Sequence, residues 1–319
     1  MTARNEPPSI RLPLSGTVAT IVPDGWGGDG HVLFLGDAEQ SHVDLADQTR
    51  IVYEYLYRIS NVVDALSAGP IRAVHLGAGA MTLPRYLATT RPGSPQVVVD
   101  IEWGLLSFVE EYLPLPEGTV LQRIGDDARV AVGFAAHLLE GRADLVVLDV
   151  FAGADAPEHL TTTGFYREVA KTLDDDGVLA VNVGDDPPLT FFRSQAAALL
   201  EVFDGVAALA EAPMFSGEQA GNLVLVASRQ PLTREWLDAR VAEGPHPAAG
   251  LDRDELAAFA AGVPAPEDDP EQRWLEANAE RRRRLRRLTH GFDPDLPAPD
   301  LDEEDPGPPP EEPGGPGTR

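Results

Sequence analysis

The stretch Ile71-Arg-Ala-Val-His-Leu-Gly-Ala-Gly-Ala-Met-Thr82 decides the fold. An apolar run of strand length leads directly into glycines at positions 77 and 79, which is typical of a strand that turns sharply into a helix. The same alternation continues downstream. Further apolar runs cover 96–100, 144–149, 177–183 and 222–228, and amphipathic stretches cover 84–89, 103–113, 128–139, 162–173 and 189–203. Apolar strands separated by helices predict an α/β fold with a doubly wound parallel sheet covered on both faces.

The flanks of this region differ from it. Upstream, the strand-like runs 16–22 and 32–35 are separated by the turn sequence Asp24-Gly-Trp-Gly-Gly-Asp-Gly30, which predicts a small β-hairpin; we call residues 1–46 the lid. From Asp47, a candidate cap, apolar residues recur at helical spacing. We predict a nucleoside-binding catalytic domain over 47–230. A helical extension should follow over 231–290, with candidate helices at 234–242, 251–261 and 272–290.

The last segment, 291–319, is predicted to be a disordered acidic tail, because residues 293–319 contain nine acidic residues and nine prolines. The run Arg281–Arg287 precedes it. We interpret this run as a solvated helix face, with an RNA or membrane patch as the alternative.

Composition excludes several classes of function. The chain has 319 residues with 52 Asp+Glu against 25 Lys+Arg, and a net charge of −27 disfavours binding to nucleic acid or to anionic membranes. It has no cysteine, which excludes disulfides, thiolate zinc sites and a cysteine nucleophile. No His, Asp or Glu cluster has metal-ligand spacing, so we expect no metal. The sequence has neither a signal-peptide pattern nor an apolar stretch near the ~20 residues that span a bilayer, and we expect a cytoplasmic protein.

Polar or glycine residues follow four of the predicted strands, at the edge where doubly wound sheets bind ligands. Gly77 and Gly79 let a tight turn bring backbone amides close to a ligand, although an ordinary strand-to-helix turn explains them equally well. Asp100 and Glu102 lie at the end of the next strand. Asp100 follows Gly77 by 23 residues, which is about the spacing at which nucleotide-binding sheets place an acidic residue that binds a ribose diol. A helix cap is the alternative for either residue.

The third and fourth junctions add further carboxylates. Asp126 and Asp127 precede Ala128, where a carboxylate can accept a hydrogen bond from an adenine amine and the next backbone N–H can reach a ring nitrogen; helix capping is compatible with that role. Asp149 ends an apolar strand and is a candidate general base, or a turn residue. The only lysine, Lys171, lies away from these junctions, and no P-loop is present. An adenosyl sulfonium such as S-adenosylmethionine fits a site without phosphate-binding groups.

With these motifs, the chain resembles the spermidine synthase (polyamine aminopropyltransferase) family over residues 16–228. Matching segments are VHLGAGAMTLPRY, VVDIEWGLL and GDDAR for the nucleoside, LFLGDAEQSHVD with RIVYEY for the lid and its helix, DLVVLDVFAGADAPEHLTTTGFY for the gate loop, and APMFSGEQAGN for the substrate segment. The resemblance implies an S-adenosylmethionine-dependent methyltransferase (Rossmann-like) fold and a homodimer. It also implies decarboxylated S-adenosylmethionine as co-substrate and a small amine as acceptor.

The resemblance also assigns residues. Gln40 would contact the donor near its sulfonium, Asp100 its ribose and Asp127 its adenine amine, while Asp149 would hold the acceptor amine and accept its proton. Tyr53 would lie on the substrate side. The site departs from the family in its acceptor half: the second gate aspartate falls on Ala152 and the tyrosine of the substrate segment on Phe215. Asp155, Glu158 or Asp185 would then have to hold the far ammonium of a diamine.

We therefore expect a spermidine synthase-like transferase, of the kind that serves polyamine biosynthesis, which moves an aminopropyl group to an amine. Two alternatives stay open. One is an S-adenosylmethionine-dependent methyltransferase on the same sheet, and the other is a non-catalytic protein that keeps the nucleoside-binding fold.

Overall fold

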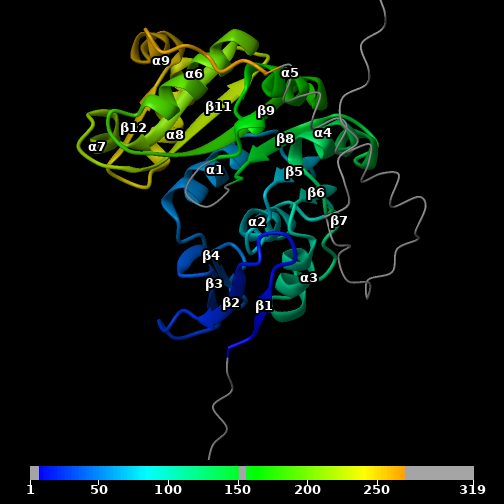
Figure 1. The fold of residues 1–319 in the computed structure, drawn as a ribbon. Coiled ribbons are helices and arrows are strands. Elements are labelled where there is room, and N and C mark those ends of the chain that lie inside the picture. Colours follow the sequence, from blue (N-terminus) through cyan, green and yellow to red (C-terminus); the bar gives the residue numbers. More distant parts are fainter. Residues whose placement is uncertain (1–6, 151–155, 270–319) are drawn as a thin grey trace, which may run out of the picture. The chain divides into compact units, whose positions relative to one another are not determined.

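The computed structural model describes residues 7–150 and 156–269. Its main sheet has eight strands in the order β12-β10-β11-β9-β8-β5-β6-β7 (Figure 1). The strands are β5 (Ala73–Leu76), β6 (Gln96–Val99), β7 (Leu121–Ile124), β8 (Ala143–Leu148), β9 (Leu173–Asp185), β10 (Gly205–Glu211), β11 (Gly221–Ser228) and β12 (Ala248–Leu251). The α/β prediction is confirmed, with one correction: β5 to β9 pair in parallel, but β11, β10 and β12 join the β9 side through antiparallel pairs, so the sheet is mixed.

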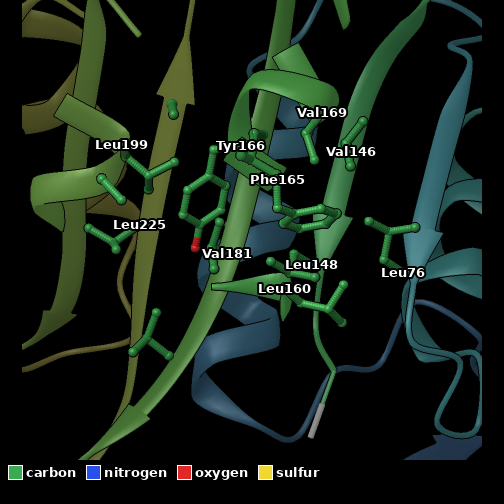
Figure 2. Close-up of a cluster of buried hydrophobic side chains, with 14 of the residues drawn as sticks. Leu76, Val146, Leu148, Leu160, Phe165, Tyr166, Val169, Val181, Leu199 and Leu225 are labelled. Carbon is green, nitrogen blue, oxygen red and sulfur yellow. The ribbon is translucent and has the colours of Figure 1, made fainter. Parts of the chain in front are cut away.

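Helices cover both faces of this sheet. They are α1 (Glu54–Asp64), α2 (Thr82–Thr90), α3 (Trp103–Tyr112), α4 (Ala128–Leu138), α5 (Thr163–Thr172), α6 (Thr190–Val202), α7 (Ala212–Phe215), α8 (Arg234–Glu243) and α9 (Arg253–Ala260), with a 3-10 turn η1 at Glu158–Leu160. One core joins α4, α5, α6 and α9 to the sheet, and Figure 2 shows Phe165 and Tyr166 of α5 in it, packed beside Val146 and Val181. A second core, on the other face, joins α1, α2 and α8. The inner strands β8 and β11 consist largely of apolar residues because both faces of the sheet are covered there.

The lid forms a sheet of its own. It has four antiparallel strands in chain order, β1 (Ser9–Arg11), β2 (Val18–Pro23), β3 (Gly30–Leu35) and β4 (Ala38–Asp44). The predicted hairpin corresponds to β2 and β3. β4 was missed because its sequence, AEQSHVD, is polar. A third core packs this sheet against α3 and the glycine turn after β5, through Ile21, Leu33 and Met81 among others.

One predicted helix begins later in the chain than expected, and two strands were not predicted. The helix predicted from Asp47 begins only at Glu54, because the Asp47 carboxylate accepts hydrogen bonds from the backbone and hydroxyl of Thr49 and closes a local turn instead. β10 and β12 were not predicted, although the helices predicted in the extension at 234–242 and 251–261 correspond to α8 and α9. The helix predicted at 272–290 and the tail at 291–319 lie outside the described residues, and the domain boundaries stay predictions. No helix within 7–150 or 156–269 is long and apolar enough to cross a bilayer.

Candidate nucleoside and amine site

Strand register lines up the predicted site residues along one edge of the sheet. Leu76 of β5 pairs with Val99 and Leu148, Val99 pairs with Ile124, and Leu148 pairs with Val181. The residues that follow these partners therefore form a row at the carboxyl edge. In order from β7 to β9 the row is Gly125, Asp100, Gly77, Asp149 and Asn182. Gly77, Asp100 and Asp149 were predicted from the sequence, Gly125 directly precedes the predicted pair Asp126 and Asp127, and Asn182 is new.

Both glycines of the turn after β5 are required by close approach. Gly77 has φ +97°, and a Cβ atom there would lie 2.0 Å from the backbone oxygen of Asp149. Gly79 has φ +48°, and its Cβ would lie 2.4 Å from the hydroxyl oxygen of Ser41 in the lid. Only glycine combines this backbone conformation with such contacts. The turn thus touches the candidate base on one side and the lid on the other.

The lid is hydrogen-bonded to this turn. The Ser41 hydroxyl accepts a hydrogen bond from the backbone N–H of Ala80 at 3.1 Å, and the Thr82 hydroxyl donates to the backbone oxygen of His42 at 2.9 Å. Gln40, the predicted donor contact, is half-buried next to Ser41 on β4. The lid is thus fixed to the turn through Ser41, and the contact of Gln40 with the donor stays a prediction.

His42, two residues after Gln40 on β4, is buried inside the lid. The residue is 1% exposed, and its Nε2 lies 3.0 Å from a carboxylate oxygen of Asp24. Trp26 stacks on its ring with centroids 5.3 Å apart. His42 is therefore part of the internal structure of the lid.

Asp149 has two hydrogen-bond donors that the sequence did not reveal. The Tyr55 hydroxyl donates to Oδ2 at 3.1 Å, and the Asn182 side-chain amide donates to Oδ1 at 2.8 Å. Burial raises the pKa of Asp149, and these two hydrogen bonds to the carboxylate oppose the rise. The result is a carboxylate that is held in one orientation and is a stronger base than an exposed aspartate.

Tyr53, the predicted substrate-side tyrosine, faces the lid. Its hydroxyl donates to the Glu39 carboxylate at 2.5 Å, and its ring stacks on that of Tyr55 with centroids 6.4 Å apart and planes at 17°. Tyr55, and not Tyr53, therefore contacts Asp149. The two tyrosines come from the start of α1, where Tyr53 precedes the first helical residue.

The two acidic residues after β6, Asp100 and Glu102, accept hydrogen bonds from different segments. The Asp100 carboxylate accepts backbone N–H groups of Ala78 at 3.1 Å and Glu102 at 2.8 Å, and burial raises its pKa. It therefore reaches across to the glycine turn and also holds the backbone before α3, and its ribose role stays a prediction. Glu102 instead accepts the N–H groups of Leu14 at 3.1 Å and Ser15 at 2.5 Å, so its contacts are those of an anchor for the lid.

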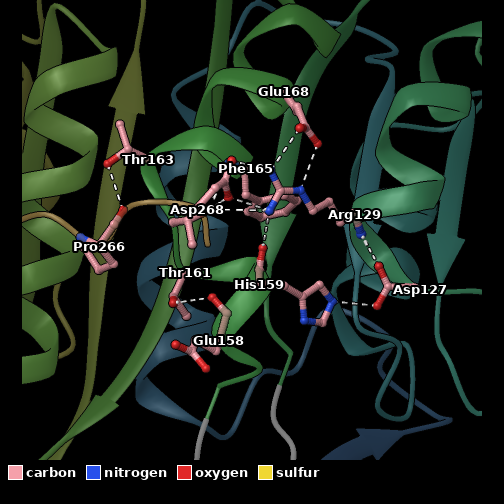
Figure 3. Close-up of polar contacts among 11 residues, drawn as sticks. Asp127, Arg129, Glu158, His159, Thr161, Thr163, Phe165, Glu168, Pro266 and Asp268 are labelled. Atoms are coloured by element: carbon pink, nitrogen blue, oxygen red, sulfur yellow. Dashed lines mark hydrogen bonds and ion pairs between the residues drawn. The ribbon is translucent and has the colours of Figure 1, made fainter. Parts of the chain in front are cut away.

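Asp127 caps α4 and binds a histidine. Its Oδ1 accepts the N–H of Arg129 at 2.9 Å, and its Oδ2 lies 2.7 Å from His159 Nε2 on η1 (Figure 3). Burial raises the pKa of Asp127, but the His159 contact and the backbone N–H groups outweigh it, and the net pKa is lowered. Asp126 accepts from the backbone N–H of Asp127 at 2.9 Å, and Ala128 starts the helix behind them. The sequence had offered capping and adenine binding as compatible roles, and the capping part is present.

Arg129 holds the surroundings of Asp127 together. Its guanidinium pairs with Glu168 at 3.0 Å and with Asp268 at 2.8 Å, and it donates to the backbone oxygen of His159 at 3.0 Å (Figure 3). Its side chain is only 10% exposed. This network ties α4, α5, η1 and the segment after α9 to one another.

The structure describes only some of the residues that were predicted to bind the acceptor amine. Phe215 is half-buried and packs against Phe192 and Phe259 with ring centroids 6.2 and 6.1 Å away. Asp155 and Ala152 lie outside the described residues. Among the residues that the structure describes, no group of three His, Asp or Glu side chains has the geometry to hold a metal ion. A hollow of about 320 Å³ lies at the other end of β7, beside Leu121 and Arg123, away from the row.

Comparisons with known proteins agree with this architecture. No family model matches the chain. The chain is 26% identical to the polyamine aminopropyltransferase of Chromobacterium violaceum over 214 aligned residues. The alignment covers 66% of this chain and 77% of that protein. A probable spermidine synthase from Corynebacterium glutamicum superposes with a TM-score of 0.74 at 27% identity, over 83% of this chain and 97% of that chain.

A more distant structure supports the fold alone. The spermidine synthase from Thermotoga maritima superposes with a TM-score of 0.51 at 14% identity, over 85% of this chain and 86% of that chain. The sequence relatives and the Corynebacterium structure show similarity in amino-acid sequence in addition to the shared fold. In sequence and in structure, this chain is a divergent relative that is similar to the spermidine synthase (polyamine aminopropyltransferase) family.

Proposed function

We propose that this protein transfers the aminopropyl group of decarboxylated S-adenosylmethionine to an amine, with Asp149 as the general base. The observation that carries the proposal is the position of Asp149 in the row at the carboxyl edge. It touches the glycine turn at Gly77 and is oriented by Tyr55 and Asn182. Asp100 lies on the other side of Gly77 in the same row, where a ribose would bind.

In the proposed reaction the acceptor arrives as an ammonium and must lose a proton before it can react. Asp149 accepts that proton. The nitrogen lone pair then attacks the aminopropyl carbon next to sulfur, the carbon–sulfur bond breaks, and its electrons pass to sulfur. The positive charge of the sulfonium is thereby neutralised and methylthioadenosine leaves. Holding amine and carbon in line supplies much of the rate acceleration.

The environment of Asp149 supports this role. Burial raises its pKa, which brings the carboxyl closer to the basicity that proton transfer from an ammonium needs. The Tyr55 and Asn182 hydrogen bonds favour its ionised form and so oppose part of that rise in pKa. The lid contributes Gln40, the neighbour of Ser41 on β4, which by the family resemblance would contact the donor near its sulfonium.

Product formation tests the proposal directly. The protein is incubated with decarboxylated S-adenosylmethionine and a panel of monoamines, diamines and polyamines, and methylthioadenosine is quantified by chromatography. We expect release with at least one amine, and a loss of at least about 100-fold in Asp149→Asn. Asp204→Asn is the matched control, because Asp204 is exposed at the opposite edge of the sheet. Absence of release with every amine would overturn the proposal.

Methyl transfer is the second candidate, and one observation favours it. Ala152 stands where the family has its second gate aspartate, so an anionic anchor for a diamine is missing at that position. Calorimetric titration separates the two candidates: tighter binding of decarboxylated than of intact S-adenosylmethionine supports aminopropyl transfer. The reverse order, together with methylation of an amine, would support methyl transfer.

Assembly and location belong to the same proposal. The family resemblance leads us to propose a cytoplasmic homodimer. Static light scattering at micromolar protein concentration tests the dimer, and a monomer mass at all concentrations would contradict it.

A further inference from the structure

A pair of tyrosines joins the candidate base to a carboxylate on the lid. The Tyr55 hydroxyl donates to Asp149 at 3.1 Å, the two tyrosine rings stack with centroids 6.4 Å apart, and the Tyr53 hydroxyl donates to Glu39 at 2.5 Å. Asp149 lies at the carboxyl edge of the sheet, whereas Glu39 is exposed on β4. Two carboxylates therefore lie at the two ends of one aromatic surface.

We propose that Glu39 binds the far ammonium of a diamine acceptor, replacing the anionic anchor that is missing at Ala152. This inference rests on the proposed aminopropyl transfer. With the reacting nitrogen at Asp149 and the second nitrogen at Glu39, the carbon chain lies along Tyr55 and Tyr53. The stack leaves the ring edges and one face of each ring for such a ligand, since aromatic surface packs against methylene groups and a ring face attracts cations.

The charge of Glu39 suits this role. Its hydrogen-bond donor is a neutral phenol, which leaves the carboxylate charge uncompensated by that contact. The same charge contributes to the raised pKa of Tyr53, although burial is the larger cause. An ammonium placed beside Glu39 gains a charge-assisted hydrogen bond while the Tyr53 bond to the other lone pairs is kept.

The other acidic candidates have contacts that point elsewhere. The Asp185 carboxylate accepts the backbone N–H of Phe192 at 2.8 Å and so holds the first turn of α6. Glu158 lies on η1 next to His159, which binds Asp127 on the adenine side of the row. Glu39 is the carboxylate that the described contacts connect to Asp149.

The experiment compares matched acceptors. Initial rates are measured for putrescine and cadaverine, and for butylamine and pentylamine, which lack the second ammonium. The variants are Glu39→Gln, which can still accept the Tyr53 hydroxyl, and the control Asp37→Asn, an exposed carboxylate in the turn just before β4. Thermal melting checks that both variants fold.

We expect Glu39→Gln to lower kcat/KM for the diamines by about three- to tenfold, the size of a partly exposed charged hydrogen bond, through an increase in KM. The monoamine rates and the Asp37→Asn rates should stay unchanged. Equal losses for diamines and monoamines, or no loss, would overturn the inference while leaving aminopropyl transfer in place. No methylthioadenosine from the wild-type protein with any amine would instead overturn the proposed function itself.

Discussion

Replacing Gly77 by alanine tests whether the glycine turn and the candidate base form one geometric unit. The new Cβ would lie 2.0 Å from the Asp149 backbone oxygen and 2.8 Å from its carbonyl carbon. Non-bonded atoms avoid separations below about 3 Å, so the end of β8 must move by about 1 Å. A displacement of that size at a reacting group costs about 100-fold in rate.

The same substitution also destabilises the fold. A non-glycine residue at φ +97° costs about 1–2 kcal/mol, and overpacking adds about 1–3 kcal/mol, so we expect a loss of about 3 kcal/mol in the free energy of unfolding. Chemical denaturation measures the stability, and methylthioadenosine release measures the rate.

Gly118→Ala is a control that introduces the same kind of backbone strain without a steric overlap. Gly118 has φ +81°, similar to Gly77, but a Cβ there meets nothing within 4 Å. We expect about 1–2 kcal/mol of destabilisation and an unchanged rate. If Gly77→Ala behaved like this control in both measurements, the coupling between the turn and Asp149 would be refuted.

Three further predictions concern the polar groups around the sheet. Removing a donor to Asp149, in Tyr55→Phe or Asn182→Leu, should raise the Asp149 pKa and move the acidic limb of the kcat/KM profile to higher pH; an unmoved limb would show that Asp149 is not the titrating base. His75 is 2% exposed, and burial lowers its pKa to about 4, compared with about 6.5 in the unfolded chain. The folded state therefore favours the neutral imidazole. This preference stabilises the fold above pH 6.5, and the stabilisation is lost as the pH falls toward 4. The loss should reach about 3 kcal/mol by denaturant titration and be absent in His75→Gln. Arg129→Leu should cost about 3 kcal/mol because it removes a largely buried guanidinium from its ion pairs with Glu168 and Asp268. Arg142→Leu, which breaks an exposed pair with Asp175 at 3.6 Å, should cost under about 1 kcal/mol; equal costs would contradict the importance of burial.

The parallel half of the sheet was predictable because its strands are buried on both faces. Residues 97–99 and 145–148 are uninterrupted apolar runs, and each is followed directly by an aspartate. β10 has a comparable run, Gly205–Glu211, but its small alanines resemble a helix as much as a strand. β12 has only four half-buried residues, and its pairing with β10 decides its conformation.

The candidate site was predictable where local spacing determines it. Gly77, Asp100 and Asp149 follow strands that register brings together, and a topological rule suffices to place them. Tyr55, Asn182 and His159 were missed because their contacts span 94, 33 and 32 positions of the chain, respectively. Side-chain direction at the start of a helix, which decides between Tyr53 and Tyr55, depends on where that helix begins.

The bond between Ser41 and Ala80 limits how the protein can be dissected. A truncated chain that starts after β4 would lose the acceptor for the Ala80 amide, which is otherwise buried, and would expose the side of Met81 and Val98 that the lid covers. An unpaired buried amide and newly wetted apolar surface both oppose folding. The glycine turn therefore cannot be studied in isolation, because it acquires its shape only in a chain that also contains the preceding strands.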